Sequence, residues 1–199
     1  MAYIILGRQL GVALFAYGNY DHGIAVATGW VIAAAGLGLI PFAISQLQIF
    51  AFYALPDTKT PALLNIPVAA LRIIVDLVLY ATLAAGAVAA GLMIGNAVSF
   101  VVAAALGYWQ LRRRLGATGL AEVLNTLGRL GAAAVIAAIP AGLVTLILVH
   151  AIGLSRLASI AELVVGGLML ILVYLAAAVS LRVREVSDVW GMIRSRIGR

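Results

Sequence analysis

Long apolar stretches without a charged side chain constrain the fold of this chain more than any other feature. Residues 28–54 and 87–109 contain no Asp, Glu, Lys or Arg, and each exceeds the ~20 apolar residues that a helix needs to cross a bilayer. In the bilayer core only helices and closed barrels satisfy the backbone hydrogen-bonding groups. The pattern therefore predicts an all-α integral membrane protein with about five transmembrane helices, at 28–54, 62–83, 87–109, 130–150 and 160–181.

The composition supports a membrane environment and argues against other classes of protein. Of the 199 residues, 65% are hydrophobic and 10% are charged, whereas a soluble domain is about 45–50% apolar and about 25% charged. The net charge of +6 does not indicate nucleic-acid binding. Most arginines lie beside the ends of apolar stretches, where topology signals and contacts with anionic membrane lipids are expected. The absence of cysteine excludes disulfides and thiol chemistry.

The basic residues also predict the orientation of the chain. If all five spans cross the membrane, the segments after the first, third and fifth spans lie on one side and hold most of the basic residues. The other side holds only Arg8 and Arg156. The positive-inside rule then places the basic segments and the C-terminus in the cytoplasm. The residues on the cytoplasmic side are Lys59, Arg112, Arg113, Arg114, Arg129, Arg182, Arg184, Arg194, Arg196 and Arg199.

Three segments are predicted to lie outside the spans. Residues 1–26 are predicted to form an N-terminal helix stub, or a helix at the membrane interface, followed by an external loop. After the span region at 27–181, residues 182–199 form the second segment, which is predicted to be a basic amphipathic tail on the inner leaflet. Residues 110–129 predict a loop with a short amphipathic helix, whose apolar face consists of Leu120, Val123, Leu124 and Leu127.

Isolated polar residues near the span ends do not indicate a catalytic centre. His22 and His150 lack the neighbouring ligands that a metal site needs, so the sequence predicts no catalytic residue, no metal and no cofactor. Glu162 lies near the outer end of its span and is expected to reach Arg156 or water. Small residues at helical spacing predict close helix packing, at Gly86, Gly91, Gly95, Gly166 and Gly167.

One pair of opposite charges lies well inside a predicted span. Arg72 and Asp76 are four residues apart and therefore share a helix face, and a charge at the bilayer centre costs ~2.5–3.5 kcal/mol. Two interpretations remain open. The pair can form a polar site that binds an anionic headgroup through Arg72 or couples an ion through Asp76, or it can be a self-neutralising pair that fixes helix packing. Asn65 and Asn96 can extend the polar surface in either case.

Three strings resemble one family of membrane transporters. The string FYALPDTKTP at 52–61 closely resembles the FYA-x-x-D-T-R/K-T-P loop of MurJ/MviN-type lipid II flippases. Residues 14–20 are similar to the family's LF-x-x-G-x-F segment, with tyrosine at the last aromatic position, and YWQLR at 108–112 is similar to the string that ends a family span. The loop residues that match the family pattern are Phe52, Tyr53, Asp57, Thr58, Lys59, Thr60 and Pro61.

The resemblance implies a fold and a cargo. Such flippases belong to the MOP superfamily, with the MATE exporters and O-antigen flippases, and have two lobes of helices around a cationic cavity. They translocate undecaprenyl-pyrophosphate-linked peptidoglycan precursor (lipid II) across the bacterial cytoplasmic (inner) membrane for cell-wall synthesis and cell shape. The resemblance further implies that 130–150 and 160–181 form a hydrophobic groove for the lipid tail. Such proteins are transporters, so the chain is not expected to be an enzyme.

The matched strings place the chain in the C-terminal part of such a flippase, as a partial MOP/MATE-like C-lobe. The family's cavity arginines lie mainly in the missing N-terminal lobe, and alternating access needs two lobes, so the chain is expected to be inactive alone. Asp76 aligns with a common asparagine, so no family role is carried over to Arg72 or Asp76. The high content of Ala, Val and Arg, with a single lysine, favours an actinobacterial source.

Two alternative functions remain open at this point. The chain can belong to a flippase for another lipid-linked oligosaccharide. It can also be a non-transporting membrane scaffold that binds cell-wall synthesis proteins through its basic loops and tail.

Overall fold

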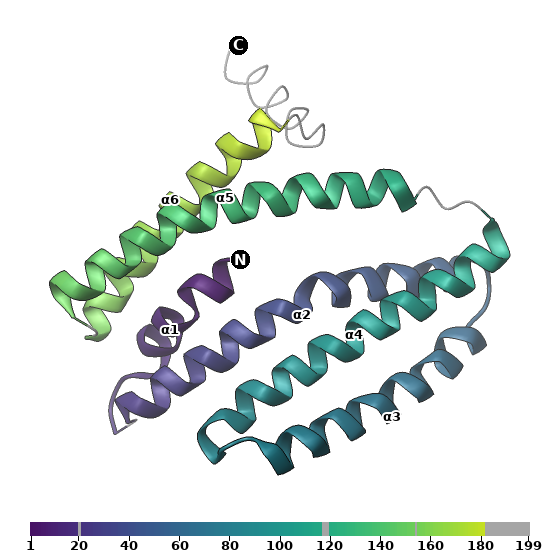
Figure 1. The fold of residues 1–199 in the computed structure, drawn as a ribbon, viewed down its shortest axis with the longest axis horizontal. Coiled ribbons are helices and arrows are strands. Elements are labelled where there is room, and N and C mark those ends of the chain that lie inside the picture. The colour runs from purple at the N-terminus through teal and green to yellow at the C-terminus, as the bar shows by residue number, and fades with distance from the viewer. Residues whose placement is uncertain (20, 117–119, 154, 182–199) are drawn as a thin grey trace.

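The computed structural model describes residues 1–19, 21–116, 120–153 and 155–181, and within these ranges every regular element is an α-helix (Figure 1). The five helices from α2 to α6 are long and apolar enough to cross a membrane, and a shorter helix precedes them. The predicted all-α membrane fold is therefore confirmed. The predicted tail 182–199 lies outside the described residues. The helices are α1 (Ala2–Phe15), α2 (His22–Ala54), α3 (Lys59–Thr82), α4 (Ala85–Leu115), α5 (Leu120–Ile152) and α6 (Arg156–Ser180).

The segment between the third and fourth spans corrects one prediction. We expected a loop with a short amphipathic helix at 110–129, but α4 continues to Leu115 and one long helix, α5, begins at Leu120. The prediction was wrong because polar residues can continue a helix beyond the bilayer. The last turn of α4 contains three arginines, which are favourable at the negative end of the helix dipole. The helix ends at Gly116, which adopts a positive φ of 77° that glycine tolerates without strain.

Side-chain caps fix two helix starts earlier than hydropathy predicted. The Asp21 carboxylate accepts a hydrogen bond from the backbone N–H of Ile24 at 3.1 Å, so α2 begins at His22 rather than at 28. The Ser155 hydroxyl oxygen accepts from the backbone N–H of Ala158 at 3.2 Å, so α6 begins at Arg156 rather than at 160. Both caps satisfy backbone donors that the first turn of a helix leaves free.

The helices form two groups joined by α1. Helices α2, α4 and α3 lie side by side, with α4 in contact with both of the others, while α5 and α6 pack against each other (Figure 1). In the described part of the chain, α1 alone contacts both groups, through α2 on one side and through α5 and α6 on the other. This short helix is therefore a packing element between the two groups.

Small residues allow α1 and α2 to approach closely. A Cβ atom added at Gly7 would lie 2.7 Å from the carbonyl oxygen of Gly29, and one added at Gly29 would lie 2.6 Å from the Cα atom of Arg8. Such distances are too short for a side chain, so the two backbones are in direct contact. This is the close packing of small residues typical of membrane helices.

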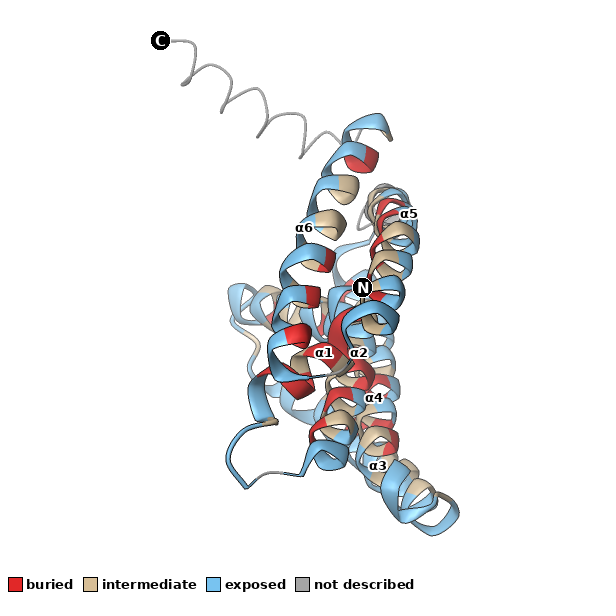
Figure 2. Ribbon diagram, turned by 90° about the vertical axis from the view of Figure 1, so that its left-hand side faces the viewer, coloured by how far each residue is buried: buried red, intermediate tan, exposed pale blue. Residues whose placement is uncertain are grey.

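The outer surface of the bundle is apolar. Figure 2 shows that the buried residues lie mainly where helices face each other and that much of the remaining surface is exposed. Among the described residues of α3, Val68 alone is buried, and large apolar side chains such as Ile74, Leu77 and Tyr80 are exposed. A soluble protein rarely exposes a continuous apolar surface of this kind. Lipid or further membrane helices must cover it.

Candidate functional site

The connection between α2 and α3, residues 55–58, is held against the end of α4 by one arginine. Arg114 at the end of α4 forms a salt bridge with Asp57, with 2.5 Å between Nη1 and Oδ2. Its Nη2 also donates a hydrogen bond to the Thr60 hydroxyl oxygen at 2.8 Å. The matched family loop and the arginine cluster of α4 therefore lie at the same end of the bundle, as the prediction of one basic side requires.

Asp57 also organises the first turn of α3. Its Oδ1 atom accepts a hydrogen bond from the backbone N–H of Thr60 at 2.9 Å. The hydrogen bonds from Thr60, and then the nearby Arg114 guanidinium, lower the pKa of Asp57 to about 2. The carboxylate is therefore ionised at neutral pH and acts as a fixed negative charge.

Phe52, near the end of α2, holds the loop by packing its side chain into the bundle. Its side chain is almost fully buried, and the Arg114 guanidinium lies over its ring at 6.0 Å from the centroid. The next residue, Tyr53, lies in the last turn of α2, is exposed and lines a cavity beside the loop. Of the matched loop residues, Phe52 and Asp57 thus hold the loop in place, while Tyr53 and Thr58 face open space.

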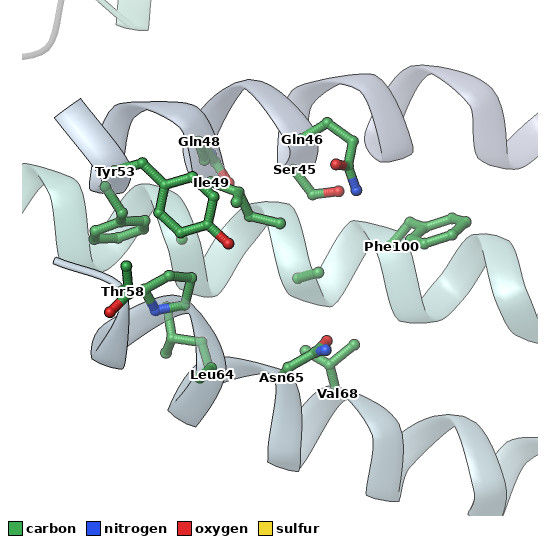
Figure 3. A pocket seen from close by; sticks show the side chains of 15 residues that line it. Ser45, Gln46, Gln48, Ile49, Tyr53, Thr58, Leu64, Asn65, Val68 and Phe100 are labelled. Atoms are coloured by element: carbon green, nitrogen blue, oxygen red, sulfur yellow. The ribbon is translucent and has the colours of Figure 1, made fainter. Parts of the chain in front are cut away.

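The cavity lies between α2, α3 and α4 and has a volume of about 390 Å³. Figure 3 shows polar side chains from α2 and α3 around this space, together with the Tyr53 ring. The predicted polar residue Asn65 lines it, whereas Arg72, Asp76 and Asn96 do not. The polar lining residues are Ser45, Gln46, Gln48, Tyr53, Thr58 and Asn65.

Gln48 links the cavity wall to α4. Its Nε2 donates a hydrogen bond to the backbone carbonyl of Ala104 at 3.0 Å, and its side chain fills the position where Gly107 has no Cβ. The Gln48 Oε1 atom is buried without a hydrogen-bond partner. This contact was not predicted, because a glutamine in a long apolar stretch gives no signal of the helix that it faces.

Arg72 and Asp76 form the expected contact along α3. The Arg72 Nε atom lies 3.5 Å from Asp76 Oδ2, and the two side chains are 48% and 27% exposed. The Asp76 carboxylate packs over α4, because a Cβ added at Gly95 would lie 2.6 Å from its Oδ1 atom. The pair therefore contacts α4 on one side and leaves the guanidinium half exposed on the other.

The two predicted asparagines are not brought together with this pair in one site. Asn65 lies on the same face of α3 as Arg72, but at 1.5 Å per residue it is about 16 Å along the helix from Asp76. Asn96 follows Gly95 on α4, and its Oδ1 atom is buried without a hydrogen-bond partner. The expected continuous polar surface is therefore divided between the cavity and the α3–α4 contact.

A second polar cluster lies where α1 meets α6, and it corrects the prediction for Glu162. The Glu162 side chain is 0% exposed, so it does not reach water. Arg156 does not approach it either, because its Nε donates to the backbone carbonyl of Ala13 at 3.2 Å. The prediction was wrong because it treated the first turns of α6 as a free interface, whereas α1 covers them.

No residue set for a metal centre is found in the part of the chain that the structure describes, where no group of three or more His, Cys, Asp or Glu side chains comes together. The polar clusters here consist of amides, hydroxyls and single charge pairs. Such groups can bind a headgroup or a small cation, and they lack the arrangement of nucleophile and base that covalent catalysis needs.

A comparison with known protein families gives one match over most of the chain. A family described as lipid II flippase MurJ matches residues 1–159. The matched range spans α1 to α5 and the first residues of α6. It therefore includes the loop held by Arg114, the cavity and the Arg72–Asp76 pair.

Proposed function

Because the chain belongs to the MurJ family of lipid II flippases, which are membrane transporters and not enzymes, we propose that it helps to move lipid-linked peptidoglycan precursor across the cytoplasmic membrane. The observation that carries this proposal is the family match over residues 1–159. The five apolar helices long enough to cross a membrane are consistent with a lipid-linked cargo that remains in the bilayer.

We propose that the chain works as one lobe of a two-lobe transporter. Alternating access requires two bundles that move against each other around a site. The exposed apolar face of α3 and the half-exposed Arg72 offer a surface for the second lobe. In this arrangement Arg72 faces the pathway and binds the anionic part of the cargo, while Asp76 holds it against α4.

The paired helices α5 and α6 are the proposed contact for the undecaprenyl tail. Their outward side chains are large and apolar, and they include Leu143, Ile147, Leu168 and Leu172, all exposed. A polyprenyl chain has no hydrogen-bonding groups, so an apolar surface without charges suits it.

The end of the bundle that carries Lys59 and the arginines of α4 faces the cytoplasm in this proposal. Arg113 lies over the Trp109 ring at 3.6 Å, which places a cation beside an aromatic residue of the type found at membrane interfaces. Arg112 and Arg113 are exposed and suit contacts with anionic lipid headgroups, which attract basic residues near the inner leaflet.

Reconstitution tests the proposal directly. Vesicles carry lipid II with a fluorophore on its sugar, and a membrane-impermeant quencher reports the outward-facing fraction. With the chain alone, we expect no increase in the fraction of fluorescence that is quenched. We expect an increase when the chain is co-reconstituted with the N-terminal lobe from the same genome. A matched arm uses a lipid-linked oligosaccharide without the peptide.

Three outcomes contradict parts of this proposal. Transport of the peptide-free oligosaccharide alone would indicate a different cargo. Transport by the chain without a second lobe would exclude the two-lobe requirement. No transport in any arm, together with recovery of cell-wall synthesis proteins on the chain, would indicate a scaffold.

A further inference from the structure

The contact between α1 and α6 contains the most deeply buried carboxyl group of the described chain. Glu162 lies about 9 Å along α6 from its first residue at 1.5 Å per residue, and its side chain is 0% exposed. Neither carboxyl oxygen has a hydrogen-bond partner. A carboxylate in this state is very unfavourable inside a membrane protein, so such residues mark functional sites or carry a counter-charge.

The register of α1 against α6 identifies what Glu162 faces. A Cβ atom added at Gly166 would lie 3.1 Å from the Leu6 Cδ2 atom, and the Arg156 Nε donates to the backbone carbonyl of Ala13. The two helices therefore run antiparallel, and Gln9 lies between these contacts, opposite Glu162. Gln9 is 4% exposed and its Oε1 atom is buried without a partner.

The other groups around the carboxyl are few. From α1, Gln9 is the polar neighbour and Arg8 the charged neighbour of the carboxyl, and the Arg8 Nε atom is also buried without a hydrogen-bond partner. On α6 itself, the Ser159 hydroxyl is buried and unpartnered one turn before Glu162. From α5, the titratable His150 is exposed and its ring bonds to the carbonyl of Leu146 in its own helix, so it does not face the site.

We propose that Glu162 is a proton-binding site in the membrane-spanning bundle, with Gln9 and Arg8 as its two alternative partners. When Glu162 is protonated, its O–H donates to the Gln9 amide oxygen and supplies the donor that this buried oxygen otherwise lacks. When the proton returns to water, the carboxylate turns to Arg8 and forms a neutral ion pair. Binding one proton therefore exchanges one α1 partner for the other.

The donor set favours a proton over a metal ion. Four buried oxygens lack partners here, two from Glu162 and one each from Gln9 and Ser159, whereas Ca²⁺ and Mg²⁺ take about six oxygen ligands. Arg8 already supplies a positive charge beside the single carboxylate. A proton needs only one acceptor, and this cluster provides it.

Infrared difference spectroscopy on the full chain in phosphatidylcholine vesicles tests the site. We expect a carbonyl-stretch band of a protonated carboxyl that disappears as the pH rises and shifts in D2O. Glu162→Gln should remove this band, while the control Asp21→Asn, at the exposed cap of α2, should leave it. Gln9→Leu should move the band because the bound proton loses its acceptor.

Three results would overturn the proposal, and one further variant guards against a failure to fold. A band that survives Glu162→Gln, or its absence at every pH, overturns the proposal. Loss of the band when NaCl replaces choline chloride at constant pH assigns the site to a metal cation and also overturns it. If Glu162→Gln does not fold by circular dichroism, Glu162→Asp, which keeps a carboxyl, should retain a shifted band. These measurements need no lipid II, so they stand or fall separately from the transport function.

Discussion

Arg114 at the end of α4 binds both Asp57 and Thr60, joining the start of α3 to the end of α4. The salt bridge to Asp57 is 2.5 Å long and the hydrogen bond to the Thr60 hydroxyl is 2.8 Å. Arginine suits this position because its planar guanidinium presents several donors in a fixed geometry. The contacts of Arg114 with Asp57 and Thr60 therefore form a structural clasp, which joins the family loop to α4 at one end of the bundle.

Replacing Asp57 should weaken this clasp in a pH-dependent manner. The folded-state pKa of Asp57 is about 2, below its ordinary value of 3.8, so its contribution to stability is present above the ordinary value. It is lost as the pH falls through the folded-state value. Asp57→Asn should lower the thermal unfolding temperature at pH 7 in detergent, and the difference from wild type should shrink between pH 4 and pH 2. Asp21→Asn, which keeps a capping oxygen, should change little.

A double-mutant cycle should show that the two ends of the clasp depend on each other. In an Arg114→Gln background, Asp57→Asn should lower the unfolding temperature less than in the wild type, because the charged partner is already gone. Arg113→Gln is the matched control, since Arg113 lies over Trp109 and not on the loop. Equal effects of Asp57→Asn in all three backgrounds would show that Arg114 does not act through Asp57.

The sequence predicted the helices better than it predicted their contacts. Hydropathy located all five long helices because the bilayer requires about 20 apolar residues in each. The helix ends were less accurate, because α4 and α5 continue through polar residues that hydropathy treats as a loop. Of the family string at 52–61, only residues 55–58 form the connection, and the flanking residues belong to the ends of α2 and α3.

The polar contacts between helices could not be predicted from the sequence. The spacing of Arg72 and Asp76 revealed their pairing because both lie on one helix. The positions of Arg114 against Asp57 and of Gln9 against Glu162 depend on how separate helices pack. The one available signal was an interruption of apolar α1 by Arg8 and Gln9, which marks a polar position facing another helix.

Adding a side chain at the α1–α2 contact should separate the two helix groups. Gly29→Leu would place atoms within 2.6 Å of the Arg8 backbone, and overpacking of this kind costs ~1–3 kcal/mol. We expect a lower unfolding temperature and faster proteolysis at the connection between α1 and α2. Gly167→Leu is the matched control, because no atom lies within 4 Å of a Cβ at that position. Equal loss of stability in both variants would show that the effect does not come from the contact between α1 and α2, because leucine is a better helix former than glycine.

Neutralising Arg72 and Asp76 one at a time should destabilise the chain more than neutralising both. Each single variant, Arg72→Gln or Asp76→Asn, leaves one charge without its partner, and a lone charge at the bilayer centre costs ~2.5–3.5 kcal/mol. The double variant removes both charges and keeps a polar side chain at each position, so folded yield in detergent should return toward that of the wild type. A double variant less stable than either single variant would exclude this explanation.

The double variant also decides between the two roles of the pair. The Nε atom of Arg72 contacts Asp76 at 3.5 Å, and the side chain remains 48% exposed, so the guanidinium has room to bind an anionic group. We therefore expect the double variant, co-reconstituted with the second lobe, to fold normally and to lose most lipid II transport. Wild-type transport at wild-type protein levels would instead show that the pair only fixes α3 against α4. Gln46→Leu, at the cavity and distant from the pair along the sequence, serves as the control for a general loss of polar groups.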